Sequence, residues 1–150
     1  MTFFRKGIAL LISALLCLCL AACGNGNAVS DGEIAGGDWR TTGTVRDSGR
    51  IVRNGETADV LICVHKEDAA FYYDKEEQVL FGDVKYPTAV NDPWGAYRST
   101  DFSDINGDGN SDVSITFSLS DGDKMIMTWL WDNAQADFIF NSELSTVTGN

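Results

Sequence analysis

The segment with the clearest chemical pattern is the acidic run inside SDINGDGNSDVSI, from Ser103 to Ile115. Three carboxylates placed so close together repel one another unless a cation lies among them, and oxygen ligands suit Ca²⁺ better than a soft metal. Carboxylate or amide side chains stand at every second position of the run. It therefore predicts a calcium site whose ligands are Asp104, Asn106, Asp108, Asn110 through its backbone carbonyl, and Asp112.

The run matches the first half of an EF-hand loop but not its end. With Asp104 as position 1, Gly109 falls at position 6, but Ile115 occupies position 12, where an EF-hand carries a bidentate Glu. An alternating apolar run follows instead of a helix, so we expect a loop that leads into a β-strand. A plain hydrated turn stays open as an alternative. A further ligand could be water or one of Asp101, Asp121 and Asp123.

Aromatic residues offer a second candidate site. Trp129 and Trp131 lie two residues apart in KMIMTWLWD, so they share one face of the expected strand. Packing in a core is one interpretation of this pattern. The other is an exposed aromatic platform for a sugar or a protein, formed by Trp129 or Trp131 together with Trp94 or Tyr97.

The sequence gives little support for catalysis. His65 is the only histidine and lies beside charged residues at an expected strand end, and Cys63 is expected to be a small buried side chain without a cationic neighbour. The motifs of serine hydrolases, zinc proteases and phosphate-binding loops are absent. We therefore expect a protein that is not an enzyme. A carboxylate pair, as in a glycoside hydrolase, leaves no sequence signature and stays open.

The N-terminal segment predicts export. Two basic residues precede the apolar run Gly7–Leu20, whose 14 residues are too few to span a bilayer. The following LAAC resembles a bacterial lipobox. We expect a lipoprotein signal peptide over residues 1–22, a lipid on Cys23, and a flexible Gly-rich tether over residues 23–37 that holds the protein to a membrane outside the cytoplasm.

Charge and cysteine content then limit the partners. Without residues 1–22 the chain carries 9 basic and 22 acidic side chains, a net charge of −13. Nucleic acid and anionic membrane surfaces would repel such a chain, whereas basic proteins, cations and neutral sugars would not. Beyond the lipidated Cys23 only Cys63 remains, so we expect no intramolecular disulfide.

Residues 38–150 have an all-β pattern. Short runs of β-branched and aromatic residues alternate with turn residues, among them Asn54-Gly55, which favours a tight hairpin. An interruption is expected at Asp47 to Gly49, and TADVLICVHK is apolar on both faces, as in a central strand. The pattern predicts a single antiparallel β domain of about seven to nine short strands, arranged as a small propeller-like fold or a meander of hairpins.

The acidic loop also resembles a known family. DINGDGNSDVSI is similar to the loops of FG-GAP and VCBS-type β repeats, in which D-x-N-G-D-G-x-x-D followed by an apolar strand binds calcium. The stretch from Ala96 to Leu144 resembles small exported bacterial β proteins related to periplasmic inhibitors of lysozyme. The resemblance implies a compact β fold with calcium on the same five residues. A single loop does not support a repeat propeller.

Together these features lead to one expected function with two alternatives. The expected function is a lipid-anchored, calcium-stabilised β module of the bacterial cell envelope that binds an envelope protein or glycan. The first alternative is an inhibitor of a lysozyme-type wall hydrolase, because an acidic surface complements a basic enzyme. The second is a carboxylate-dependent glycoside hydrolase.

Overall fold

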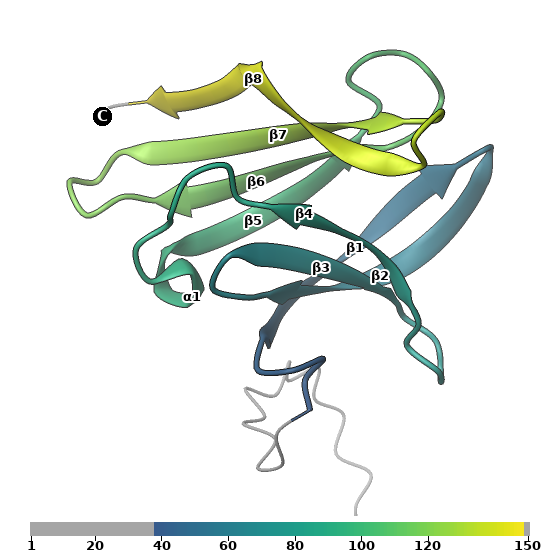
Figure 1. Ribbon diagram of the computed structural model, residues 1–150, viewed down its shortest axis with the longest axis horizontal. Coiled ribbons are helices and arrows are strands. Elements are labelled where there is room, and N and C mark those ends of the chain that lie inside the picture. The colour runs from purple at the N-terminus through teal and green to yellow at the C-terminus, as the bar shows by residue number, and fades with distance from the viewer. Residues whose placement is uncertain (1–37, 149–150) are drawn as a thin grey trace, which may run out of the picture. The chain divides into compact units, whose positions relative to one another are not determined.

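The structure is a computed structural model that describes residues 38–148 (Figure 1). The expected signal peptide, the lipidation site at Cys23 and the tether lie outside the described residues. Within the described part, no helix is long and apolar enough to cross a membrane.

Two antiparallel four-stranded sheets make up the fold, and in each sheet the strands follow one another in sequence order. The first sheet contains β1 (Thr44–Arg53), β2 (Glu56–Val64), β3 (Asp68–Tyr73) and β4 (Leu80–Lys85). The second contains β5 (Tyr97–Ser103), β6 (Asp112–Ser118), β7 (Lys124–Asp132) and β8 (Asp137–Thr148). A single helical turn, α1 (Pro93–Ala96), precedes β5. The all-β, antiparallel prediction is therefore confirmed.

The first hairpin shows one expected feature and one departure. Asn54 and Gly55 form its turn with φ angles of 50° and 78°, the left-handed conformation that an Asn-Gly hairpin needs. The interruption predicted at Asp47 to Gly49 is wrong, because β1 runs through these residues. The irregularity is instead a shift of register between Val45 and Asp47, where a bulge absorbs an extra residue and the ladder resumes.

The two sheets pack against each other around one shared core. Ile62 of β2 and Phe71 of β3 belong to the same buried cluster as Ile115 of β6. The Phe71 ring meets Phe102 and Phe138 of the second sheet edge-on, at centroid distances of 5.3 and 5.8 Å. Full burial of such a side chain stabilises a fold by about 1.5–3 kcal/mol. The apolar faces of both meanders are thus directed at each other.

The edges of the two sheets also approach each other. β1 lies beside β5, and β4 lies beside β8 (Figure 1). Gly49 permits the first approach, because a Cβ at this position would lie only 2.5 Å from the Phe102 ring. No such close contact is needed between β4 and β8, and this edge carries the groove described below.

Candidate functional site

The loop between β5 and β6 is wrapped around the carboxylate of Asp104. Its Oδ1 accepts hydrogen bonds from the backbone N–H groups of Gly107 (2.8 Å) and Asp108 (3.0 Å), and its Oδ2 from that of Gly109 (2.9 Å). Gly107 and Gly109 adopt φ angles of +77° and +86°, which glycine tolerates without steric cost. The glycines of the motif are therefore needed for the turn itself.

Asn106 and Asp108 gather beside Asp104 on the exposed side of this loop. The Asp108 N–H, already bonded to Asp104, lies 2.9 Å from Asn106 Oδ1, and Asn106 Nδ2 donates to Asp108 Oδ2 at 3.4 Å. Asn133, between β7 and β8, donates to the same Asp108 oxygen at 3.4 Å. Both lone pairs of Asp108 Oδ2 therefore have amide donors, whereas Asp108 Oδ1 accepts only the N–H of Asn110, at 2.8 Å, and keeps one lone pair for a hard cation.

The other two predicted ligands face the interior. Asp112 is fully buried, and its two oxygens accept hydrogen bonds from the N–H groups of Ile105 and Trp131, each at 2.8 Å. The Asn110 side chain is also buried and accepts a hydrogen bond from Asn54 N at 2.9 Å. These two side chains hold the loop to β7 and to the first hairpin.

The tip of the first hairpin is docked onto the end of this loop. Ser111 Oγ accepts a hydrogen bond from Val52 N at 2.9 Å, and Ser111 N donates to the Val52 carbonyl at 3.0 Å. Arg53 Nη1 donates to the Ser111 carbonyl at 2.6 Å. The loop is therefore a junction between the two sheets, which the sequence motif did not predict.

Arg53 brings a positive charge to this junction. Its guanidinium carbon lies 3.8 Å from the ring centroid of Trp131 and 4.8 Å from that of Phe138, within range of cation–π attraction. Burial lowers the pKa of Arg53 to about 10, an effect opposed by the charge of Asp112, so the side chain is cationic at neutral pH. It partly offsets the repulsion among the loop carboxylates.

The proposed metal ligands thus fall into two sets. Asp104, Asn106 and Asp108 lie on the exposed side of the loop, and the side chains of Asn110 and Asp112 are buried. Among residues 38–148, no three His, Cys, Asp or Glu side chains are close enough to form a metal-binding group. Of the additional candidates, Asp101 accepts a hydrogen bond from Ser103 Oγ at 2.8 Å, and Asp121 accepts one from Asp123 N at 3.1 Å.

The four aromatic residues predicted as a platform do not share one exposed face. Tyr97 and Trp129 are buried, at 4% and 2% exposure. Trp94 is half-buried and donates its indole N–H to the Val64 carbonyl at 3.0 Å, which fixes α1 to the end of β2. Trp131 is half-buried and stacks on Arg53 near the acidic loop. Trp129 lines the groove described next, together with residues that were not predicted, and Trp94 lines a different cavity.

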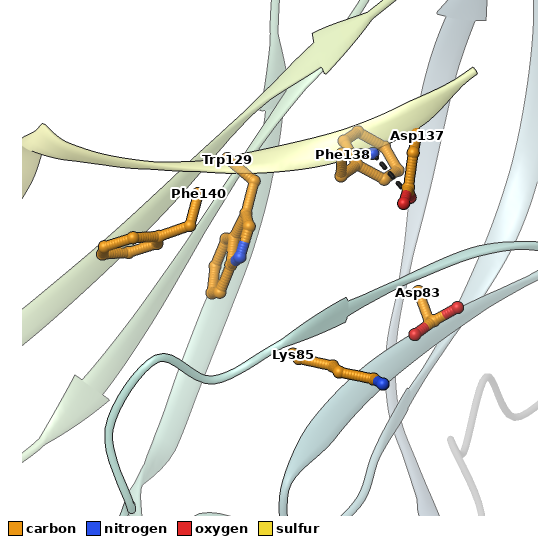
Figure 2. A pocket seen from close by; sticks show the side chains of 6 residues that line it. All are labelled: Asp83, Lys85, Trp129, Asp137, Phe138 and Phe140. Atoms are coloured by element: carbon orange, nitrogen blue, oxygen red, sulfur yellow. Dashed lines mark hydrogen bonds between the residues drawn. The ribbon is translucent and has the colours of Figure 1, made fainter. Parts of the chain in front are cut away.

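This groove of about 380 Å³ lies between β4 and β8 (Figure 2). Aromatic side chains of the second sheet face charged side chains of β4 across it, and the complete lining is Asp83, Lys85, Trp129, Asp137, Phe138 and Phe140. Burial raises the pKa of Asp83, and the negative charges of Asp68 and Asp137 raise it further. The groove thus combines an aromatic surface with two carboxylates from opposite sheets.

Sequence reasoning missed the groove because its residues belong to strands far apart in the chain. No local spacing connects Asp83 with Asp137, and only the packing of the two sheets brings them to one edge. The single available signal was the aromatic strand that contains Trp129. No family model, curated protein or solved structure matches this chain, so its function has to be argued from these residues and their geometry.

Proposed function

We propose that this protein is a lipid-anchored β module of the bacterial cell envelope that binds a glycan in the β4–β8 groove and is stabilised by calcium at the β5–β6 loop. The groove is the observation that carries the proposal. Its volume falls within the range of small-molecule sites, and it joins aromatic surface to a few polar groups, as such sites do.

The lining of the groove suits a sugar. The half-buried Phe140 ring offers apolar surface for the C–H face of a pyranose ring, and the buried Trp129 supports it edge-on at a centroid distance of 5.7 Å. Asp83 and Asp137 can accept hydrogen bonds from sugar hydroxyls, and Lys85 can donate them. Because the acidic and basic groups partly balance, a neutral glycan fits this lining better than a strongly charged ligand.

The proposed calcium ion has a structural role at the sheet junction. Asp104, Asn106 and Asp108, which gather on the exposed side of the loop, would hold it, and the carbonyl of Asn110 and the carboxylate of Asp112 would have to approach them to complete the ligand set. The ion would neutralise the carboxylates of the loop. The same loop receives the tip of the first hairpin through Ser111. Extracellular calcium sites with Kd values of about 10⁻⁴ to 10⁻³ M are adequate for such a role.

Titration calorimetry with N-acetylglucosamine oligomers tests the binding proposal. We expect heat of binding for the purified protein in mild detergent, and its loss in Phe140→Ala and Asp137→Asn. Asp74→Asn, which removes the same charge from the β3–β4 turn, is the control and should bind normally. Unchanged binding in both groove variants would contradict the assignment. Inhibition of a basic lysozyme without glycan binding would favour the inhibitor alternative.

The groove also supports a second candidate, a carboxylate-dependent glycoside hydrolase. An acid catalyst needs a carboxyl group that holds its proton, and burial together with the charges of Asp68 and Asp137 raises the pKa of Asp83. Asp83 would be the general acid, and Asp137 the base or nucleophile. Chromatography of oligosaccharides after incubation decides this: turnover must disappear in both Asp83→Asn and Asp137→Asn, and an intact substrate with the unmodified protein excludes the activity.

A further inference from the structure

A second cavity, of about 650 Å³, lies on the outer face of the first sheet and is lined in part by His65 and Asp68. Asp68 Oδ1 is 2.5 Å from His65 Nδ1, and His65 Nε2 is 3.5 Å from the sulfur of Cys63. In the tautomer whose Nδ1–H is donated to this carboxylate, Nε2 is left as an acceptor for the thiol proton, and the Trp39 carbonyl lies 3.9 Å from the same sulfur. Cys63 and His65 are two residues apart and therefore lie on the same side of the sheet.

We propose that Cys63, His65 and Asp68 form a covered acyl-transfer site, with Cys63 as nucleophile, His65 as base and Asp68 as positioning residue, and that the segment Trp39–Gly43 is its lid. Nucleophile, base and orienting carboxylate in hydrogen-bonded order are the arrangement that activates a thiol. The cavity shares one lining residue, Asp83, with the β4–β8 groove, but the site itself consists of Cys63, His65 and Asp68 and does not depend on the glycan-binding proposal.

The lid lies directly against the thiol and the imidazole. A Cβ added to Gly43 would stand 2.1 Å from His65 Cδ2 and 2.5 Å from Cys63 Sγ, so only a glycine backbone fits there. Trp39 packs edge-on against Tyr72 at 5.8 Å and belongs to the small cluster around Cys63. As a result Cys63 has no solvent exposure.

The conformation of the lid is one that its sequence does not favour. Arg40, Thr41 and Thr42 have φ angles of 41°, 63° and 70°, in the left-handed region that β-branched residues rarely adopt. The turn is closed by a 3.1 Å hydrogen bond from Gly43 N to the Trp39 carbonyl. The Arg40 guanidinium lies 5.4 Å from the centroid of the Trp39 ring. A strained segment that belongs to no strand can lift without loss of the sheet beneath it.

The lid determines whether the thiol is reactive. When it is closed, burial and the charge of Asp68 raise the pKa of Cys63 to about 11, which keeps the thiol protonated. When it lifts, the thiol proton passes to His65 Nε2, and the sulfur attacks the carbonyl carbon of an ester. A thioester forms as the bond to the leaving alkoxide breaks, and the protonated His65 gives its proton to this alkoxide, which leaves as the alcohol. Water, deprotonated by His65, then hydrolyses the thioester, releases the acid and restores the thiol.

Two independent substitutions open the lid and allow a direct test. Trp39→Ala removes its anchor, and Gly43→Ala introduces a Cβ that cannot fit. With p-nitrophenyl acetate as the probe and the lipidated protein without residues 1–22, in which Cys63 is the remaining thiol, we expect no burst from the unmodified protein and a burst of about one p-nitrophenolate per chain from each lid variant. Adding Cys63→Ala should abolish the burst, and adding His65→Gln should slow it about a hundredfold. Peptide mapping by mass spectrometry should place the acetyl group on Cys63.

Controls separate lid opening from unfolding. Near-UV circular dichroism reports whether each lid variant keeps the packed aromatic core, and Gly43→Ala carries the test if Trp39→Ala unfolds. The urea-unfolded chain provides the reaction rate of an exposed thiol without a base. A burst in folded lid variants that exceeds this rate and depends on His65 supports the site. Acetylation that is absent from Cys63, independent of His65, or no faster than in urea overturns it.

Discussion

The β1–β2 and β5–β6 hairpins contain a similar short sequence, but its aspartate has a different role in each hairpin. Their second strands contain the similar segments Asp59–Ile62 and Asp112–Ile115, and the Val and Ile of each segment are fully buried. The aspartates differ. Asp59 is exposed and pairs with Arg50 across the hairpin at 3.1 Å, whereas Asp112 is fully buried.

The turn that closes each hairpin explains the difference. In the first hairpin, strand pairing extends from Asp59 toward the turn as far as the pair Arg53 and Glu56. The two-residue turn at Asn54-Gly55 then closes the hairpin, and a turn of this type needs no support from a side chain. In the second the ladder ends at the pair Ser103 and Asp112, and a loop folds back over the aspartate. The same residue type is therefore a surface charge in one hairpin and an internal anchor in the other.

The largest expected effect comes from removing each of these aspartates. Asp112→Ala leaves the buried N–H groups of Ile105 and Trp131 without partners, and we expect the free energy of unfolding to fall by about 3–5 kcal/mol. Asp59→Ala should change it by less than about 0.5 kcal/mol, because an exposed ion pair contributes little. Urea denaturation of both variants measures the two values. Equal losses would break the distinction between the hairpins.

Calcium should act on the second hairpin alone. At about 10 mM free Ca²⁺, which is about 100 times a Kd of 10⁻⁴ M, a ligand that binds only the folded state stabilises it by about 2.7 kcal/mol and therefore raises the melting temperature. Asp104→Asn should abolish this rise, since Asp104 organises the loop. Asp74→Asn, of equal charge change, should retain it. Differential scanning fluorimetry with added calcium and with chelator gives the comparison, and a rise that survives Asp104→Asn counts against the loop site.

The contrast also shows which features were accessible from sequence. The alternation of β6 and the Asn54-Gly55 turn are local patterns, and both elements formed as predicted. The inward orientation of Asp112 is not local, because it depends on Trp131 of the next strand. Two further features join the two sheets: Val52 docks on Ser111, and Asp83 and Asp137 line one groove. These residues lie far apart in the chain, so a local sequence pattern cannot predict that they meet.

The docking of one hairpin on the other should have a moderate energetic effect. Ser111→Ala removes the hydroxyl that accepts the Val52 N–H, and we expect a loss of about 1–2 kcal/mol in the free energy of unfolding. Ser48→Ala, an exposed serine in the same strand as Val52, should change it by less than about 0.5 kcal/mol. Chemical denaturation compares the two. A loss no greater than that of Ser48→Ala would mean that the sheets do not depend on this junction.

The smallest expected effect lies at the opposite edge, where Asp83 of the first sheet and Asp137 of the second share the groove. The folded state raises the pKa of Asp83 through burial and through the charges of Asp68 and Asp137, so it binds this proton more tightly than the unfolded chain does. As the pH rises from the usual pKa of an aspartate through the raised pKa of Asp83, the free energy of unfolding therefore falls, and the loss persists at higher pH.

Asp83→Asn removes this contribution and should make the protein slightly more stable than the unmodified chain at neutral pH. Asp137→Asn should give part of the same gain by removing one of the charges that act on Asp83. Melting temperatures of the three proteins between about pH 3 and pH 7 test this, and an Asp83→Asn curve parallel to that of the unmodified protein would show that the carboxylates of the two sheets do not interact across the groove.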